Sequence, residues 1–397
     1  MGSPQHTYPV IHITGTNGKG STTRMISSLL QAEGVNSGSY TSPHLEVINE
    51  RLAIADRPIG DDDLAAQLAA LAELERFLRV EASWFELMTA AAFRWFADEA
   101  VQAAVIEVGL GGRYDATNVA DGTVAVVTNV QLDHTEILGN SRELIAAEKA
   151  GIVKPGSVLV LGENDPSIAA IFEAEAREVG AAAVWKRGKD FSAENVRIAV
   201  GGRVADLVTP ATRYVDVFIP LFGAHQCENA AASLAGTQAF LGDVLSDDVV
   251  REGFDSVRAP GRMEVVRTQP LVVLDGAHNG AGAAAAGAAL REDFSGARRV
   301  ILVMGCLRSR DPGELLMALS SDRLATVIAC MPPSPRALPA EAIVQVAGQA
   351  GLRAEESGDV VDAVTRALQI AGDDDLVLVT GSLYVVGAAR GFLRSIV

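Results

Sequence analysis

Short apolar runs rich in Val and Ile alternate along the chain with longer segments of helical periodicity. This alternation is typical of parallel strands joined by crossover helices. The runs are nearly continuous in apolar residues, as expected of strands that helices cover on both faces. In the first half of the chain, strands are expected at residues 8–14, 103–108, 124–129 and 158–161. The pattern therefore predicts an α/β fold.

The strand expected at residues 8–14 is followed by the loop GTNGKGS at residues 15–21 and then by a helical segment. Backbone N–H groups in such a loop bind phosphate together with the dipole of the helix, and Lys19 would neutralise the outer phosphates. The loop is a variant of the usual nucleotide-binding pattern, because Ile13 stands where the first glycine is expected and Gly20 follows the lysine. The alternative is a glycine-rich turn with an incidental lysine.

A break in the pattern divides the chain. In residues 196–220 the apolar residues recur at a shorter period, which is more typical of strands. The segment RAPG at 258–261 interrupts local order. A fresh series of expected strands follows, at residues 271–274, 300–303, 326–329 and 376–379. We expect a P-loop-type domain with a mostly parallel sheet over residues 1–264, followed by a smaller Rossmann-like α/β domain over residues 265–397.

Composition excludes several classes of function. The 33 Lys and Arg against 50 Asp and Glu give a net charge of −17, which disfavours binding to nucleic acid or to anionic membranes. No segment approaches the roughly 20 unbroken apolar residues of a membrane span, and residues 1–10 show no export signal. The three cysteines have no metal-ligand spacing and predict neither a disulfide framework nor zinc. We expect a cytoplasmic protein that binds no nucleic acid and no membrane.

Polar motifs follow several of the expected strands: TSPHL contains Ser42, EVGLGGR begins with Glu107, and LDH ends with His134. The carboxyl ends of strands in an open α/β sheet share one crevice, so these side chains are expected to converge beside the phosphates. A hydroxyl, a carboxylate and an imidazole around phosphate favour Mg²⁺ over zinc. Taken singly, a glutamate after a strand is more often a cap and a lone histidine an ordinary surface or core residue.

A series of ordered sequence blocks then points to one family. The blocks are GTNGKGS, TSPHL with NERL, EVGLGGRYDATN, LDHTEILG with EKAGIVKPG, APGR, LDGAHN and VTGSLYVVG. Together they resemble folylpolyglutamate synthase and dihydrofolate synthase, which belong to the Mur ligase superfamily. The resemblance extends from about Pro9 to the C-terminus. It implies a monomeric ATP-dependent ligase.

The resemblance also implies a reaction. A substrate carboxylate attacks the γ-phosphate of ATP, and the amine of L-glutamate then displaces phosphate from the acyl phosphate to form an amide. The acid would be dihydropteroate or a folate. The block LDHTE, with Asp133, is similar to versions that accept dihydropteroate, which favours an enzyme that both adds the first glutamate and extends the tail. The sequence itself does not decide between these two steps.

Site residues carried over from the family fall into four groups. The nucleotide contacts are Thr16, Asn17, Gly18, Lys19, Gly20, Ser21, Asn229, Arg262 and Asp275. The catalytic residues are Lys19, Lys149 and His278, and Lys149 matches a lysine that family members carry as a carbamate suited to a second magnesium ion. The magnesium-site residues are Ser42, Glu107 and His134, and the pterin-pocket residues are Phe85 and Asp133. For Lys149 the alternative is a surface lysine that caps a helix.

Three other hypotheses stay open. A related Mur-type ligase would act on another carboxylic acid, such as a peptidoglycan precursor. A dinucleotide-binding oxidoreductase is suggested by GAGAAA at residues 280–285, but the next expected strand ends without the acidic residue of that fingerprint, so these small residues are expected to pack a helix. A nucleotide-binding regulatory protein without turnover is disfavoured by the retained lysines, glutamate and histidine.

Overall fold

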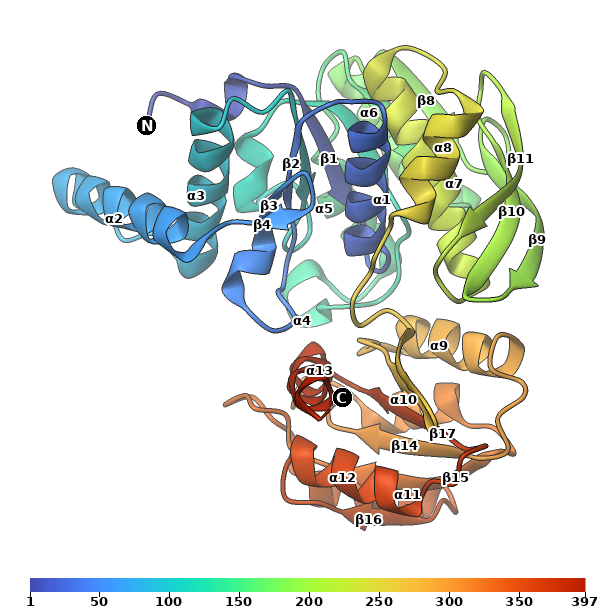
Figure 1. Ribbon diagram of the computed structural model, residues 1–397. Helices are drawn as coiled ribbons and strands as arrows, with labels where there is room; N and C mark the ends of the chain where they lie inside the picture. Colours follow the sequence, from blue (N-terminus) through green and yellow to red (C-terminus); the bar gives the residue numbers. More distant parts are fainter. Residues whose placement is uncertain (397) are drawn as a thin grey trace. The chain divides into compact units, whose positions relative to one another are not determined.

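The computed structural model describes residues 1–396, which form two compact units (Figure 1). The first unit comprises residues 1–199, 204–220 and 226–258, and the second comprises residues 200–203, residues 221–225 and the chain from Ala259 onward. The boundary predicted between residues 264 and 265 therefore falls a few residues inside the second unit, at the start of its first strand.

A mostly parallel sheet forms the centre of the first unit, with the strand order β4-β3-β2-β5-β1-β6-β7-β8. The pairs from β2 to β8 are parallel, and β3 and β4 add an antiparallel edge. The strands are β1 (Val10–Thr14), β2 (Ser37–Tyr40), β3 (Leu52–Ile54), β4 (Arg57–Pro58), β5 (Ala103–Glu107), β6 (Gly122–Val127), β7 (Val158–Leu161) and β8 (Ala183–Lys186).

Helices cover both faces of this sheet because its strands are apolar on both sides. On one face, a Cβ placed on Gly236 of α7 would lie 3.1 Å from Val126 of β6 and 3.5 Å from Ile26 of α1. The other face packs against α3, α5 and α6. The helices are α1 (Lys19–Ala32), α2 (Asp61–Leu78), α3 (Trp84–Asp98), α4 (Thr135–Leu138), α5 (Arg142–Ala150), α6 (Pro166–Val179), α7 (Ala224–Leu241) and α8 (Asp247–Asp255), with 3-10 turns at η1 (Pro4–His6), η2 (Ile48–Arg51) and η3 (Ala116–Val119).

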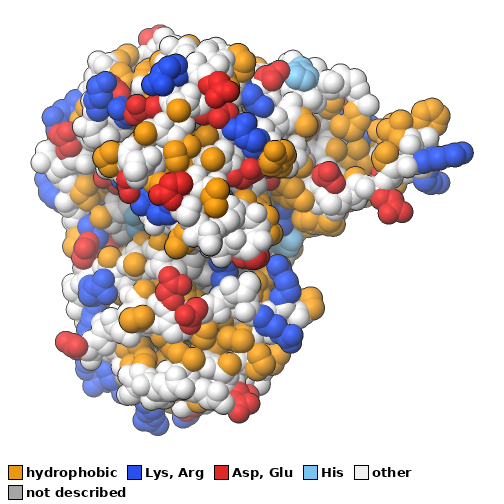
Figure 2. All heavy atoms as spheres, turned by 180° about the vertical axis from the view of Figure 1, so that it is seen from behind, with side chains coloured by type: hydrophobic (Ala, Val, Ile, Leu, Met, Phe, Trp, Pro, Cys, Tyr) orange, Lys and Arg blue, Asp and Glu red, His pale blue; other side chains and the backbone are white. Residues whose placement is uncertain are grey.

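Two features extend from the core of the first unit. The strand-like region after residue 190 is a three-stranded sheet of order β11-β10-β9, made of β9 (Ser192–Ala199), β10 (Gly202–Val208) and β11 (Arg213–Ile219). Helix α2 projects away from the sheet (Figure 1), and apolar side chains gather at its far end (Figure 2). Phe77, Leu78 and Val80 are exposed there.

The second unit is built on a sheet of order β12-β13-β17-β14-β15-β16, parallel except for the edge strand β12. Its strands are β12 (Glu264–Thr268), β13 (Leu271–Leu274), β14 (Val300–Met304), β15 (Leu324–Ala329), β16 (Ala354–Glu356) and β17 (Leu376–Thr380). Its helices are α9 (Gly280–Glu292), α10 (Pro312–Leu319), α11 (Ala340–Gln349), α12 (Val360–Ile370) and α13 (Leu383–Ser395). The predicted fold class, a P-loop-type unit followed by a smaller Rossmann-like unit, is confirmed.

The small residues that mimic a dinucleotide fingerprint open helix α9. A Cβ on Gly280 would lie 1.8 Å from Oε1 of Glu314, and one on Gly287 would lie 2.4 Å from the carbonyl oxygen of Ala318. Helices α9 and α10 therefore approach each other more closely than side chains at these positions would permit.

Two expectations drawn from composition can be compared with the described residues. No helix within residues 1–396 combines the length and apolarity that a membrane crossing requires. Cys227, Cys306 and Cys330 are all buried free thiols, so they form no disulfide.

Candidate active site

The glycine-rich loop leaves β1 at its carboxyl end and enters α1 at Lys19. Gly15 and Gly18 have φ values of +149° and +87°, which side chains rarely adopt. A Cβ on Gly15 would lie 1.8 Å from Oγ1 of Thr128, and one on Gly18 would lie 2.7 Å from Oδ1 of Asn229. The sequence predicted that the helix begins at Thr22, but it begins three residues earlier, at Lys19. The left-handed turn at Gly18 directs the next residue into the helix.

Replacement of Gly15 by alanine is expected to weaken ATP binding by about tenfold or more, because the added methyl group has no space beside Thr128 and the loop must move. Isothermal titration with ATP measures the effect. Gly34→Ala is the matched control, since Gly34 also has a positive φ of +82°, but no neighbouring atom of residues 1–396 lies within 4 Å of the added Cβ. Equal ATP affinity in the Gly15 variant and the wild type would contradict the assignment of the loop.

Contacts from the segment after β6 hold the loop in place. The N–H of Thr16 donates to the carbonyl oxygen of Asn129 at 2.9 Å, and the N–H of Asn17 donates to Oδ1 of Asn129 at 3.1 Å. The hydroxyl of Thr16 donates to the carbonyl oxygen of Gln131 at 3.1 Å. These hydrogen bonds from the neighbouring segment fix the conformation of the loop.

Two lysines converge on one carbonyl of this loop. Nζ of Lys19 lies 3.1 Å from the carbonyl oxygen of Gly15, and Nζ of Lys149 lies 3.0 Å from the same oxygen. Lys149 is buried in the last turn of α5, so it is not the surface helix cap of the alternative hypothesis. Burial, with the nearby charge of Lys19, lowers the pKa of Lys149 to about 7. A large fraction of this amine is therefore neutral near neutral pH.

Oxygen donors lie beside the same loop. The N–H of Ser42, after β2, donates to Oε2 of Glu107 at 3.1 Å, and that oxygen is 3.5 Å from where a Cβ on Gly20 would lie. Ser21 carries a buried hydroxyl with no hydrogen-bond partner among the described residues. A carboxylate and an unpartnered hydroxyl next to a phosphate loop suit Mg²⁺, which prefers oxygen ligands.

His134, the third residue predicted for the magnesium site, lies in the segment between β6 and α4. It precedes α4 in a left-handed conformation with φ of 50°, and its Nε2 lies 3.8 Å from Oδ1 of Asp133. Within residues 1–396, no three His, Cys, Asp or Glu side chains are grouped closely enough to hold a metal. The hydrogen bond from Ser42 brings this residue and Glu107 together. The metal role of His134 stays a prediction.

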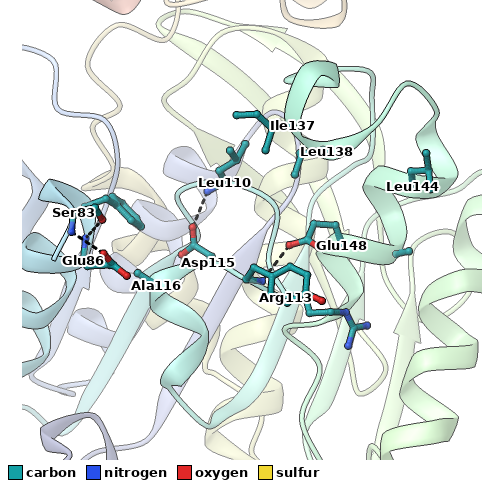
Figure 3. A pocket seen from close by; sticks show the side chains of 13 residues that line it. Ser83, Glu86, Leu110, Arg113, Asp115, Ala116, Ile137, Leu138, Leu144 and Glu148 are labelled. Carbon is teal, nitrogen blue, oxygen red and sulfur yellow. Dashed lines mark hydrogen bonds between the residues drawn. The ribbon is translucent and has the colours of Figure 1, made fainter. Parts of the chain in front are cut away.

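A cavity of about 720 Å³ opens between the start of α3, the segment after β5 and the helices α4 and α5 (Figure 3). This volume suits a small-molecule ligand. Its lining residues are Ser83, Phe85, Glu86, Leu110, Arg113, Tyr114, Asp115, Ala116, Ile137, Leu138, Leu144, Ala147 and Glu148. Phe85 lines the cavity, whereas Asp133, also predicted for the pterin pocket, is not among these residues.

Asp115 is a lining residue that the sequence reasoning did not single out. Its Oδ2 accepts a hydrogen bond from the N–H of Leu110 at 2.9 Å (Figure 3), and its Oδ1 accepts from the N–H of Thr117 at 3.0 Å. The only sequence signal was its place in the block RYDATN, where Asp is a common N-cap. In the structure it caps η3 and also lines the cavity.

The predicted residues of the second unit gather around Gly276. Asp275 is buried, accepts hydrogen bonds from the N–H groups of Met263 and Ala277, each at 2.9 Å, and has a pKa that burial raises. A Cβ on Gly276 would lie 2.3 Å from Nη1 of Arg262. Nδ1 of His278 lies 2.8 Å from the carbonyl oxygen of Gly276, which only accepts, so this nitrogen carries the proton.

Comparison with protein families gives the class of the protein. Residues 64–237 match the Mur ligase middle domain, and residues 261–383 match the glutamate ligase domain of Mur ligases. The protein is thus a Mur-type ligase, an ATP-dependent enzyme that joins an acid to an amino acid.

Individual relatives define the family more closely. A dihydrofolate synthase/folylpolyglutamate synthase of Mycobacterium tuberculosis is 37% identical, with 98% of this chain and 87% of that protein covered. A structure of Mycobacterium tuberculosis folylpolyglutamate synthase complexed with ADP has a TM-score of 0.93 at 38% identity, covering 99% of this chain and 92% of the other. Escherichia coli FolC in complex with DHPP and ADP gives a TM-score of 0.89 at 29% identity, covering 99% and 91%. The chain belongs to the folylpolyglutamate synthase/dihydrofolate synthase family.

Proposed function

We propose that the chain uses ATP to join the carboxylate of dihydropteroate or a folate to the amine of L-glutamate. One observation carries the proposal: Glu148 lines the large cavity, while the next residue, Lys149, contacts the phosphate loop at Gly15. The cavity and the phosphate loop are therefore neighbours in one unit. An acid bound in the cavity can present its carboxylate to the γ-phosphate.

The reaction proceeds in two displacements. A carboxylate oxygen of the acid attacks the γ-phosphorus of ATP and expels ADP, which leaves an acyl phosphate. The amine of glutamate then attacks the acyl carbon, the bond to the phosphate oxygen breaks, and the amine loses a proton to solvent. Loop N–H groups and the ammonium of Lys19 stabilise charge on the transferred group, so catalysis depends mainly on positioning and electrostatics.

Magnesium fits the oxygen donors beside the loop, and when bound it would neutralise phosphate charge. We assign Ser21, Ser42 and Glu107 to it, with His134 as a further candidate from the family. Gly18, Gly20 and the N–H groups of Thr16 and Asn17 belong to the phosphate cradle, and Asn229 adjoins it at Gly18. In the second unit, Arg262 and Asp275 are assigned to the nucleotide and His278 to its phosphates.

Lys149 is proposed to react with carbon dioxide. Its neutral Nζ attacks the carbon of CO₂, and the nitrogen loses a proton to give a carbamate. Two ammonium groups on one carbonyl oxygen repel each other, whereas a carbamate at Lys149 would form an attractive pair with Lys19. This conversion adds a carboxylate suited to a second magnesium ion.

The cavity is assigned to the pterin end of the acid. Phe85 offers an aromatic face there, and Asp115 offers an acceptor for ring N–H groups. We further propose that the enzyme performs both the first addition of glutamate and extension of the tail, as a cytoplasmic monomer.

A labelling experiment tests the proposed mechanism. Dihydropteroate carrying heavy oxygen in its carboxylate is incubated with the protein, ATP, Mg²⁺ and glutamate. An acyl phosphate transfers one labelled oxygen to inorganic phosphate, which mass spectrometry detects. Turnover that leaves the phosphate unlabelled would overturn the acyl-phosphate route.

Replacement of Glu107 by glutamine is expected to raise the Mg²⁺ concentration for half-maximal turnover by about tenfold, because an amide oxygen replaces a charged ligand. The titration is run with the ATP concentration held constant. Glu178→Gln, an exposed position on α6, is the control and should titrate like the wild type. If the Glu107 variant and the wild type have the same metal dependence, Glu107 is not a ligand.

A further inference from the structure

A buried histidine lies behind the acceptor of the large cavity. His12 occupies the middle of β1, between apolar residues, and has no solvent exposure. An imidazole buried among apolar residues is unfavourable unless it is hydrogen-bonded. Its Nε2 lies 2.8 Å from Oγ1 of Thr117, which is itself fully buried.

His12, Thr117 and Asp115 form a series of hydrogen bonds, and the carboxylate of Asp115 determines which group donates and which accepts. Oγ1 of Thr117 lies 2.5 Å from Oδ1 of Asp115, and a carboxylate only accepts. The single hydroxyl hydrogen of Thr117 is therefore directed to Asp115, and the hydroxyl oxygen accepts from Nε2–H of His12. Within residues 1–396, Nδ1 of His12 has no hydrogen-bond partner, and burial lowers the pKa of His12 to about 3, so the ring is neutral with its hydrogen on Nε2.

These hydrogen bonds leave the carboxylate of Asp115 with acceptor capacity for one more donor. A carboxylate has about four lone-pair sites. The N–H of Leu110, the N–H of Thr117 and the hydroxyl of Thr117 occupy three of them. The remaining acceptor capacity is available to a ligand in the cavity that Asp115 lines.

We propose that His12 is a positioning residue for substrate recognition: acting through Thr117, it fixes Asp115 as the acceptor for an N–H group of the heterocycle in the cavity. The inference rests on the proposed function, because it assumes that the pterin end of the acid occupies this cavity. His12 itself does not touch the substrate. Without the N–H of His12, the Thr117 hydroxyl loses the donor that holds it in place, and its hydrogen bond to Oδ1 of Asp115 is less firmly directed.

The test compares two substitutions at position 12. His12→Leu removes the donor, whereas His12→Gln places an amide N–H close to the position of Nε2. His12→Leu is expected to raise KM for dihydropteroate or folate roughly tenfold, with KM for ATP within about twofold of the wild type. His12→Gln should recover most of the loss. Unchanged KM for the acid in a folded His12→Leu protein overturns the proposal.

A double-mutant cycle separates this role from general support of the fold. If His12 acts through Asp115, then His12→Leu should cause no further rise in KM for the acid when it is added to Asp115→Asn. Fully additive effects, or equal rises in KM for the acid and for ATP, would indicate structural support alone and contradict the proposal.

Thr117 provides a second comparison, which decides the matter if His12→Leu does not fold. Thr117→Val removes the hydroxyl and is expected to raise KM for the acid roughly tenfold, whereas Thr117→Ser keeps it and should stay near the wild type. Equal KM values for the acid in both variants and the wild type would overturn the proposed role of His12 and Thr117. Failure of the proposed function gives a different result: the wild type would turn over none of these acids, which would also overturn the proposed role of His12.

Discussion

Replacement of Lys19 by alanine is expected to lower turnover by about a hundredfold to a thousandfold, the range found when a preorganised electrostatic contact to a transition state is removed. Nζ of Lys19 is held 3.1 Å from the carbonyl oxygen of Gly15 and 3.3 Å from that of Thr16. The ammonium is thus held at the phosphate loop by two backbone carbonyls. Steady-state release of ADP with saturating acid and glutamate measures the loss.

Lys189→Ala is the matched control for this variant, because Lys189 is an exposed lysine in the turn after β8. The control should keep wild-type turnover. The thermal unfolding midpoint of the Lys19 variant should stay near that of the wild type, which shows that the protein is folded. Wild-type turnover in a folded Lys19→Ala protein would remove the loop from the catalytic account.

Replacement of Lys149 by alanine is expected to reduce turnover by a similar factor, about a hundredfold or more, because the variant has no amine to form the carbamate. The substitution also leaves a buried space beside Gly15. A short carboxylic acid such as formate or acetate can enter that space and supply the missing carboxylate. Added acid should therefore restore part of the turnover in a saturable manner.

The rescue has its own control in the Lys19 variant. The same acids should not restore turnover to Lys19→Ala, since that variant lacks a cation rather than a carboxylate. If Lys149→Ala keeps full turnover, Lys149 has no part in catalysis. If its turnover is lost and no carboxylic acid restores it, the carbamate is contradicted and the amine itself is the required group.

Continuous apolar runs were the most predictive part of the sequence. The strands expected at residues 158–161 and 271–274 coincide with β7 and β13, because buried parallel strands need apolar residues at every position. The short strands β3 and β4 and the projecting helix α2 were not predicted. Strand β4, at the edge of the sheet, carries no apolar signal because Arg57–Pro58 is exposed, and β3 is only three residues long.

Candidate site residues are visible in the sequence where a local motif carries them. The glycine loop and Lys19 lie in one short segment, so their pattern is visible in the sequence. Asp115 was missed because the cavity that it lines is assembled from α3, the segment after β5, α4 and α5, which come together only in the folded protein. The burial of Lys149 likewise depends on the packing of α5, which the sequence of that helix alone does not specify.

The most direct test of the account is a parallel assay of acids with one preparation of the protein. Purified protein is supplied with Mg²⁺ and ATP, with and without L-glutamate, and with dihydropteroate, tetrahydrofolate or a peptidoglycan precursor. ADP release is measured, and mass spectrometry identifies the products. We expect glutamate-dependent ADP release and a glutamyl amide with dihydropteroate, tetrahydrofolate or both. Turnover with the peptidoglycan precursor alone would contradict it and assign the chain to another acid within the Mur ligases.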